Sequence, residues 1–223
     1  MRRFVAVSLL LVPAAMPLSA QFEGTISMTM STHSGGNSAD MQYLIKGHKI
    51  AYTMSSPMAP GQQVRMIMDL DAQKTIMLIP VAMGDTKGMM MTIDLKQAAA
   101  HAAKQAPPVV TALGTSQTIA GYRCSDFEMT DKKNVTRMCI SQDLGRFAFS
   151  GGRGGGAAAP DWTRAFGDKP GFPLKVWTAD GKVSMEVTSV HKGSVPDSVF
   201  AIPDGYKDMS GMMGMGRRGG GDQ

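Results

Sequence analysis

Hydrophobic and polar residues alternate along most of this chain with a period of two residues. Between residues 25 and 31, Ile26, Met28 and Met30 alternate with Ser and Thr, which is the pattern of a strand with one buried face. The same alternation returns in later segments, which we predict to be strands. These are residues 41–46, 49–55, 63–70, 74–80, 89–93, 122–130, 134–141, 174–178 and 182–191. The short connections between them predict a long antiparallel meander.

Turn residues support this meander at two places. Gly47-His48 separates two alternating segments and predicts a hairpin, in which Ile50, Tyr52 and Met54 lie on one face of the second strand. Asp180-Gly181 separates the last two strands, and an Asp-Gly pair between alternating segments is a strong hairpin signal.

Helices are expected to be few and short. Asp94 can cap a helix over residues 95–105, which is rich in alanine and ends before Pro107-Pro108. A second helical stretch is predicted over residues 143–149 and again over 160–166. Between these two parts, residues 151–159 are rich in Gly and Ala and predict a flexible loop, and residues 208–223 predict a disordered Met/Gly-rich tail.

The amino terminus predicts export. Arg2 and Arg3 precede an apolar stretch over residues 4–12, and small residues lead to Ala20, which is the order of a secretory signal peptide cleaved after Ala20. The apolar stretch is shorter than the ~20 residues that a membrane helix needs, so we do not expect an integral membrane protein. A buried N-terminal helix is the alternative. The expected location is periplasmic or secreted, with one domain over residues 21–207.

Composition and charge exclude several classes of protein. The chain has 223 residues and is 43% hydrophobic, which excludes a wholly disordered chain. Its formal net charge is +5, and removal of Arg2 and Arg3 with the signal peptide lowers it to +3. No run of basic residues interleaved with aromatic residues occurs, so we expect no nucleic-acid partner.

The two cysteines, Cys124 and Cys139, predict a disulfide. An even number of cysteines in an exported protein indicates pairing. They lie in two predicted strands on either side of a turn centred near residue 132, where positions whose numbers sum to about 263 face each other, as 124 and 139 do. A redox or metal role is the alternative, but the chain has no CxxC motif.

Several short motifs resemble those of a known family. They are Phe22-Glu23-Gly24, the Lys-Gly turn within residues 43–49, Asp69-Leu70-Asp71, Ile119-Ala120-Gly121-Tyr122, and the closing segment 195–206. Together they resemble the exported bacterial family of domain of unknown function 4412, and the closing segment is similar to the ends of LolA-like lipoprotein carriers. The resemblance implies a curved, unclosed antiparallel sheet (a LolA-like half-barrel) of about ten strands with helices in its concave mouth. In such carriers the concavity holds acyl chains.

The candidate chemical groups do not predict an enzyme, a metal site or a cofactor. The four histidines, His33, His48, His101 and His191, are scattered and form no H-x-x-x-H pattern. Asp69 and Asp71 lie at a turn, and a calcium loop would need further oxygen ligands. We therefore interpret them as solvated turn residues.

Methionine is abundant, with 21 residues against 14 aromatic residues. The flexible thioether adapts both to irregular cores and to variable apolar ligands. We therefore predict a non-catalytic exported cell-envelope protein that binds or carries a lipid-like ligand, with simple core filling by methionine as the alternative. The predicted apolar ligand face comprises Ile26, Met28, Met30, Tyr52, Met54, Met66 and Met68.

Two other functions stay open. The chain could be a structural or interaction module of the envelope that binds a partner protein through an exposed strand edge. The methionines of the tail, Met209, Met212, Met213 and Met215, could also bind Cu(I), which thioether ligands select.

Overall fold

The computed structural model describes residues 22–31, 38–55, 61–82, 84–102, 108–131, 134–148 and 171–210. Twelve strands are present in these residues, together with helix α1 (Leu95–Ala102) and a 3₁₀ turn, η2 (Asp197–Phe200). The strands are β1 (Gly24–Ser31), β2 (Ser38–Lys46), β3 (Lys49–Ser55), β4 (Gln63–Asp69), β5 (Lys74–Ile79), β6 (Gly88–Asp94), β7 (Val109–Ile119), β8 (Tyr122–Asp131), β9 (Asn134–Ser141), β10 (Phe172–Thr178), β11 (Val183–Lys192) and β12 (Tyr206–Asp208).

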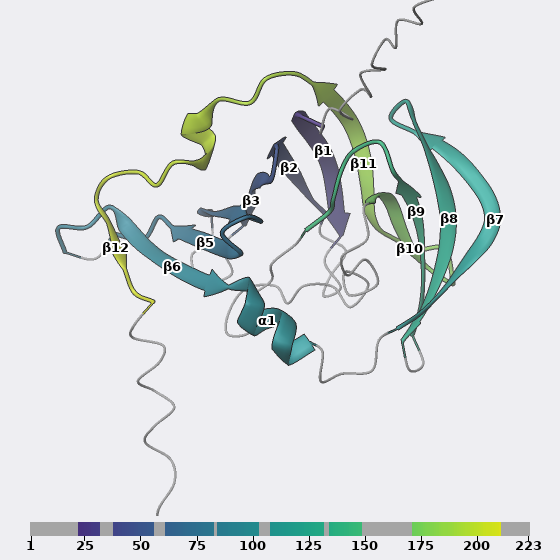
Figure 1. The fold of residues 1–223 in the computed structure, drawn as a ribbon, viewed down its shortest axis with the longest axis horizontal. Helices are drawn as coiled ribbons and strands as arrows, with labels where there is room; N and C mark the ends of the chain where they lie inside the picture. The colour runs from purple at the N-terminus through teal and green to yellow at the C-terminus, as the bar shows by residue number, and fades with distance from the viewer. Residues whose placement is uncertain are drawn as a thin grey trace, which may run out of the picture.

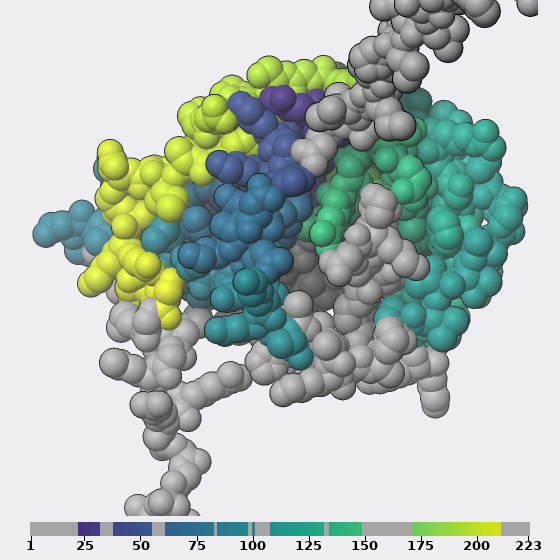
Figure 2. Space-filling view, in the orientation of Figure 1, coloured from purple at the N-terminus to yellow at the C-terminus, as the bar shows by residue number. Residues whose placement is uncertain are grey.

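All twelve strands form one curved sheet that does not close. Their order is β12-β6-β5-β4-β3-β2-β1-β11-β10-β9-β8-β7, and Figure 1 shows the sheet bending into a horseshoe with α1 at its open side. The two ends of the sheet, β12 and β7, lie on opposite sides of the molecule (Figure 2). The predicted mostly β fold with a curved, unclosed sheet and short helices is therefore confirmed.

The sheet is mixed rather than wholly antiparallel. β12 runs parallel to β6, with Tyr206 opposite Gly88, while the other neighbouring strands pair in antiparallel fashion. The reason is the connection that precedes β12. After β11 the chain does not turn back in a hairpin but crosses the outer face of the sheet to reach its far end (Figure 1).

This crossing segment, residues 193–205, lies against the outer face of the sheet at β3. Ala51 and Ile67 face each other across β3 and β4, and both are buried, as is Val195 of the segment itself. η2 packs against β3, and Asp197 of η2 forms an ion pair with Lys46 at 2.8 Å. Burial of these side chains fastens the segment to the sheet.

The helix predictions were right in one case and wrong in another. α1 begins after Asp94, whose Oδ1 accepts hydrogen bonds from the backbone N–H groups of Lys96 and Gln97 at 2.8 and 3.2 Å, as an N-cap does. The second predicted helix is wrong over residues 143–148, which form a turn and an irregular segment. Gly145, with φ of +76°, adopts a left-handed conformation that a helix does not contain. Residues 160–166 lie outside the described residues.

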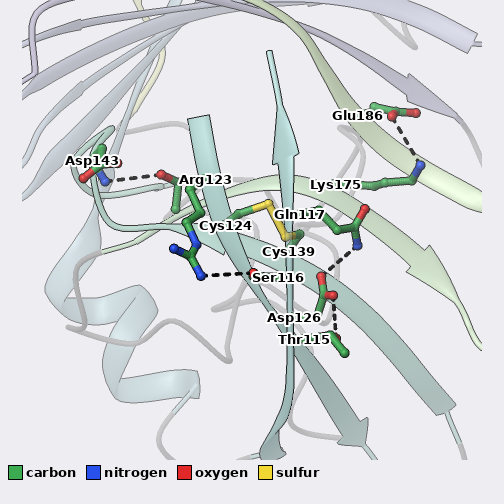
Figure 3. The surroundings of a disulfide bond; sticks show 11 residues. Thr115, Ser116, Gln117, Arg123, Cys124, Asp126, Cys139, Asp143, Lys175 and Glu186 are labelled. Carbon is green, nitrogen blue, oxygen red and sulfur yellow. Dashed lines mark hydrogen bonds and ion pairs between the residues drawn. A yellow bond between two sulfur atoms is a disulfide. The ribbon is translucent and has the colours of Figure 1, made fainter. Parts of the chain in front are cut away.

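The predicted disulfide joins Cys124 of β8 to Cys139 of β9, with the two Cα atoms 5.3 Å apart (Figure 3). The predicted register was wrong by two residues, because Asp131 and Asn134 close the hairpin and Cys139 therefore lies opposite Asp126 rather than Cys124. The bridge is thus diagonal, and its Cα separation still falls in the range that disulfides adopt.

Some expectations concern residues that the structure does not describe. The signal peptide (1–20), the Gly/Ala-rich loop (151–159) and residues 211–223 of the tail lie outside the described residues. The expected end of the domain, residue 207, falls within β12. The backbone N–H of Met209 then bonds to the carbonyl of Met90 at 2.9 Å, so the described chain follows the sheet edge to Ser210.

Candidate functional site

The inner, concave face of the sheet is covered by apolar side chains. Residues directly opposite each other in paired strands point to the same face, so the register defines rows that cross the sheet. One row consists of Val190 (β11), Ile26 (β1), Tyr43 (β2), Tyr52 (β3), Met66 (β4), Met77 (β5) and Met91 (β6). A second consists of Met30 (β1), Met185 (β11), Val176 (β10), Met138 (β9), Phe127 (β8) and Ala112 (β7). Neither row contains a charged side chain.

The seven residues of the predicted ligand face all lie on this inner face. Five of them are buried, and these are Ile26, Met28, Tyr52, Met66 and Met68. The other two, Met30 and Met54, are half-buried at its margin. The sequence pattern therefore identified residues that share one surface of the sheet. Their contact with a ligand stays a prediction.

A segment that follows β9 lies against this face. Leu144 and Phe147 are buried in the same apolar core as the sheet. The ring of Phe147 stacks on Tyr43 at 5.5 Å between centroids, and Phe172 of β10 meets both rings edge-on at 5.1 and 5.4 Å. The ring of Tyr52 also stacks with that of Tyr43, at 5.7 Å between centroids. These four aromatic rings fill the centre of the inner face.

The segment is also held by hydrogen bonds. The Tyr43 hydroxyl donates to the carbonyl of Ala148 at 2.7 Å and accepts the N–H of the same residue at 3.0 Å. Burial raises the pKa of Tyr43 well above its ordinary value, so the hydroxyl stays neutral and able to donate. Phe147 N–H bonds to the carbonyl of Gly171 at 3.1 Å, which ties the segment to the start of β10.

A fully buried polar side chain lies within the apolar inner face. Thr75 of β5 lies in the row Ile45, Ile50, Met68, Thr75, Ile93 and is completely buried. Its hydroxyl oxygen has no hydrogen-bond partner among the described residues. Buried polar groups are nearly always hydrogen-bonded, so this position is unusual.

The outer face near the disulfide is polar. Asp126 is buried, and its carboxylate accepts hydrogen bonds from Thr115 at 2.7 Å and Gln117 at 2.8 Å (Figure 3). Lys175 and Glu186, which share this face, form an ion pair at 3.2 Å. Each charged group is thus satisfied by neighbouring strands, which is the arrangement of a structural network.

The acidic residues near Asp69 make local contacts in the part of the chain that the structure describes. Asp69, the last residue of β4, accepts the N–H of Ala72 at 2.8 Å, and Asp71 in the following turn contacts His48 at 2.6 Å. In the described ranges, no three His, Cys, Asp or Glu residues lie close enough to hold a metal ion. No helix in these ranges has the length and hydrophobicity to cross a membrane.

A small cavity of about 260 Å³ lies at the β6–β12 end of the sheet, away from the aromatic centre. It is lined by Gly84, Thr86, Met89, Lys207 and Met209. Met209 is the only one of the four methionines in the Cu(I) hypothesis that lies within the described residues. The ammonium group of Lys207 at the same cavity would repel a cation.

Sequence reasoning missed three features of the inner face. Tyr43 lay in a predicted strand but was not assigned to the ligand face. Phe147 was expected in a helix, and an isolated aromatic residue in an irregular segment carries no periodic signal. Thr75 lies in a strand with apolar residues on both faces, so only its pairing with β4 and β6 shows which way it points.

Comparisons with known proteins agree with this architecture. Two solved structures of PNGF-II, in the C2 and P21 space groups, superpose on the chain with TM-scores of 0.52 and 0.51 at 13% identity. They match 86% and 87% of this chain, which spans about a third of the length of those proteins (32% and 33%), and at this identity the likeness concerns the fold alone. No curated protein matches the sequence. The family model of the domain of unknown function DUF4412 matches residues 22–206, nearly all of the described sheet, and the chain therefore belongs to that family.

Proposed function

We propose that this protein is a non-catalytic, exported cell-envelope protein that holds a lipid-like ligand on the concave face of its sheet. The observation that carries the proposal is the continuous apolar inner face, which extends from Met91 on β6 to Ala112 on β7. The margins of this face, at Met30, Met54, Met77 and Met91, are partly exposed and would give a ligand its first contact. The lipoprotein carriers that the sequence resembles use a similar concavity for acyl chains, which adds support.

Methionine suits this face better than rigid apolar residues would. The half-buried Met30, Met54, Met77 and Met91 pack against the buried core at its margins. Their unbranched side chains can change rotamer to follow a flexible chain, at a lower cost than branched residues. A ligand would contact these residues first.

The segment that carries Leu144 and Phe147 occupies the centre of the same face. A ligand that reaches this centre must therefore displace the two side chains and break both hydrogen bonds between Tyr43 and Ala148. We expect binding to be slower and weaker than the apolar area alone would give, because part of the binding energy is spent on this displacement.

The proposed export has a supporting observation that does not depend on the ligand. The disulfide Cys124–Cys139 is of the kind that persists in oxidising compartments. Mass spectrometry of the mature amino terminus would test cleavage after Ala20. A protein that retains residues 1–20 after expression in a bacterial host would contradict it.

The ligand is tested with native protein and two matched variants. Native mass spectrometry of protein purified from envelopes should show bound lipid, and delipidated protein should bind phospholipid or fatty acid saturably. Met91→Glu places a charge on the inner face and should weaken binding at least tenfold. Thr92→Glu, which is exposed on the other face of β6, should not. Absence of both copurified lipid and saturable binding would overturn the proposal.

An interaction role has its own supporting observation, on β7. This terminal strand carries three of the four exposed large hydrophobic residues in the described chain, Val109, Val110 and Leu113. It has eleven residues and no charge, whereas β12 at the other end has three residues that include Lys207 and Asp208. Charges and short length protect sheet edges from pairing, and β7 has neither.

A second copy of this chain is the partner that fits β7. Antiparallel self-pairing of an uncharged strand brings no like charges together and covers the same valines on both copies. Analytical ultracentrifugation should show a dimer that Thr111→Lys dissociates and Thr92→Lys, on β6, leaves intact. A monomeric wild-type protein at all accessible concentrations would exclude this role.

A further inference from the structure

The unpartnered hydroxyl of Thr75 is the feature that the fold does not explain. Its side chain is 0% exposed, and its oxygen has no hydrogen-bond partner within the described residues. A hydroxyl that gives up water without gaining a partner destabilises the fold. Valine has nearly the same shape as threonine and an equal preference for strands, so the strand itself does not require the hydroxyl at this position.

The surroundings of Thr75 are those of an apolar binding surface. Met68 and Ile93 lie directly opposite it on β4 and β6, and Met77 follows it on the same face of β5. Met77 and Ile93, the neighbours of Thr75 on this face, are half-buried, so the surface is partly exposed directly beside Thr75. The mouth of the sheet is close, because the N–H of Leu95, the first residue of α1, bonds to the carbonyl of Gln73 at 2.9 Å.

We propose that Thr75 binds the polar group of the ligand, and that this group is neutral: an ester, amide or alcohol attached to an apolar chain. This inference rests on the proposed ligand-binding function. The Thr75 hydroxyl can donate to an ester or amide carbonyl and can also accept from an alcohol or amide N–H. An apolar ligand that carries such a group satisfies the hydroxyl while its chain lies along the methionines.

The lack of basic side chains beside Thr75 argues against an ionised polar group on the ligand. The row that contains Thr75, from Ile45 to Ile93, and the next row, from Tyr52 to Met91, contain no Lys, Arg or His. A carboxylate or phosphate placed there would lose its hydration without a cation to pair with, which is far more costly than burial of a neutral group. An ionised head group would therefore stay outside the face, in water.

The test compares an apolar probe with a polar one. Pyrene reports on the apolar face by its fluorescence and has no hydrogen-bonding group, and dodecan-1-ol competes with it. In Thr75→Val we expect the affinity for dodecan-1-ol to fall about fivefold or more while that for pyrene stays unchanged, because only the alcohol loses a hydrogen bond. Thr92→Val, on the exposed side of β6, should alter neither affinity.

The same variant gives a second readout. Removal of an unsatisfied hydroxyl should raise the melting temperature of ligand-free Thr75→Val by about 2–4 °C. Equal dodecan-1-ol affinity in wild type and Thr75→Val would overturn the assignment of Thr75. A wild-type protein that binds neither pyrene nor dodecan-1-ol would instead overturn the proposed ligand-binding function, so the two failures are distinguishable.

Discussion

Tyr43 and Ala148 lie 105 residues apart in sequence and exchange two hydrogen bonds. The Tyr43 hydroxyl donates to the Ala148 carbonyl and accepts its N–H, so one side chain satisfies both backbone polar groups of a residue that lies outside the strands. This contact holds the segment after β9 against the inner face, where Phe147 stacks on the same tyrosine ring. Tyr43 of β2 thus holds the segment that covers the centre of the inner face.

Tyr43→Phe keeps the ring and removes both hydrogen bonds. The Ala148 N–H and carbonyl lose their partner, so we expect the free energy of unfolding to fall by about 1–3 kcal/mol. Chemical denaturation measures this loss. Hydrogen exchange should accelerate at residues 147 and 148 more than in the strands. Tyr122→Phe removes a hydroxyl from a half-buried ring of β8 and is the matched control; an equal loss in both variants would show that Tyr43 holds nothing in particular.

Reduction of the disulfide should weaken the β7–β9 end of the sheet. Cys124 and Cys139 are 15 residues apart, and a loop of that size is expected to stabilise the fold by about 3 kcal/mol in the chain-entropy account. The double variant Cys124→Ala, Cys139→Ala should lower the urea midpoint by the corresponding amount. Addition of a reductant should shift wild type toward the variant and leave the variant itself unchanged, and a midpoint of wild type that reductant does not move would contradict the expectation.

Periodicity predicted the strands with one buried face and failed where that condition does not hold. β1 alternates cleanly because one face is buried, and its inner residues Ile26 and Met28 were identified from sequence alone. β7 was missed because residues 109–116 are exposed on both faces, which leaves no alternation to detect. Tertiary contacts, not local pattern, place β7 beside β8.

The other differences between prediction and structure depend on how the strands pair, which the sequence pattern alone does not give. In β5, Met77 points inward and Leu78 is buried on the outer face, so its sequence is apolar on both sides and does not show where Thr75 lies. The disulfide was predicted from export and cysteine number, but its diagonal geometry depends on the closing pair Asp131 and Asn134. The candidate site combines both cases: its apolar row was predictable, while its polar residue and its aromatic centre depend on contacts between distant segments.

Asp126 should be sensitive to loss of its charge although it is not part of the ligand face. Asp126→Ala leaves the donors of Thr115 and Gln117 without their acceptor, and we expect a loss of about 1–3 kcal/mol in the free energy of unfolding. Asp126→Asn should destabilise less, because its amide oxygen can still accept from Gln117 and its NH2 group can donate to the Thr115 hydroxyl, which can also accept. Thermal unfolding measures both. Lipid binding should be unchanged at a temperature where the variants are folded, and a selective loss of binding would contradict the structural role.

The ion pair between Lys46 and Asp197 should make the fastening of the crossing segment depend on pH. The hydrogen bond and charge of Lys46 lower the pKa of Asp197 below its ordinary 3.8, and Asp197 in turn raises the pKa of Lys46 above 10.5. A lowered carboxyl pKa gives stability that is present above pH 3.8 and is lost as the pH falls through the pKa of the folded state. A raised ammonium pKa gives stability that is present below pH 10.5 and is lost above the folded value.

The pair should therefore contribute a constant amount between about pH 5 and 9 and less at both extremes. Both groups are solvent-exposed, so the contribution is small and should diminish in 1 M salt. The measurement is the difference in urea midpoint between wild type and Asp197→Asn, with Asp204→Asn, on the same segment, as the control. We expect this difference to be flat near neutrality and to shrink as the pH falls below the ordinary carboxyl pKa of 3.8 and through the lowered pKa of the folded state. A difference that grows as the pH falls would show that Asp197 is stabilised in its protonated form, contrary to the geometry of its 2.8 Å contact with Lys46.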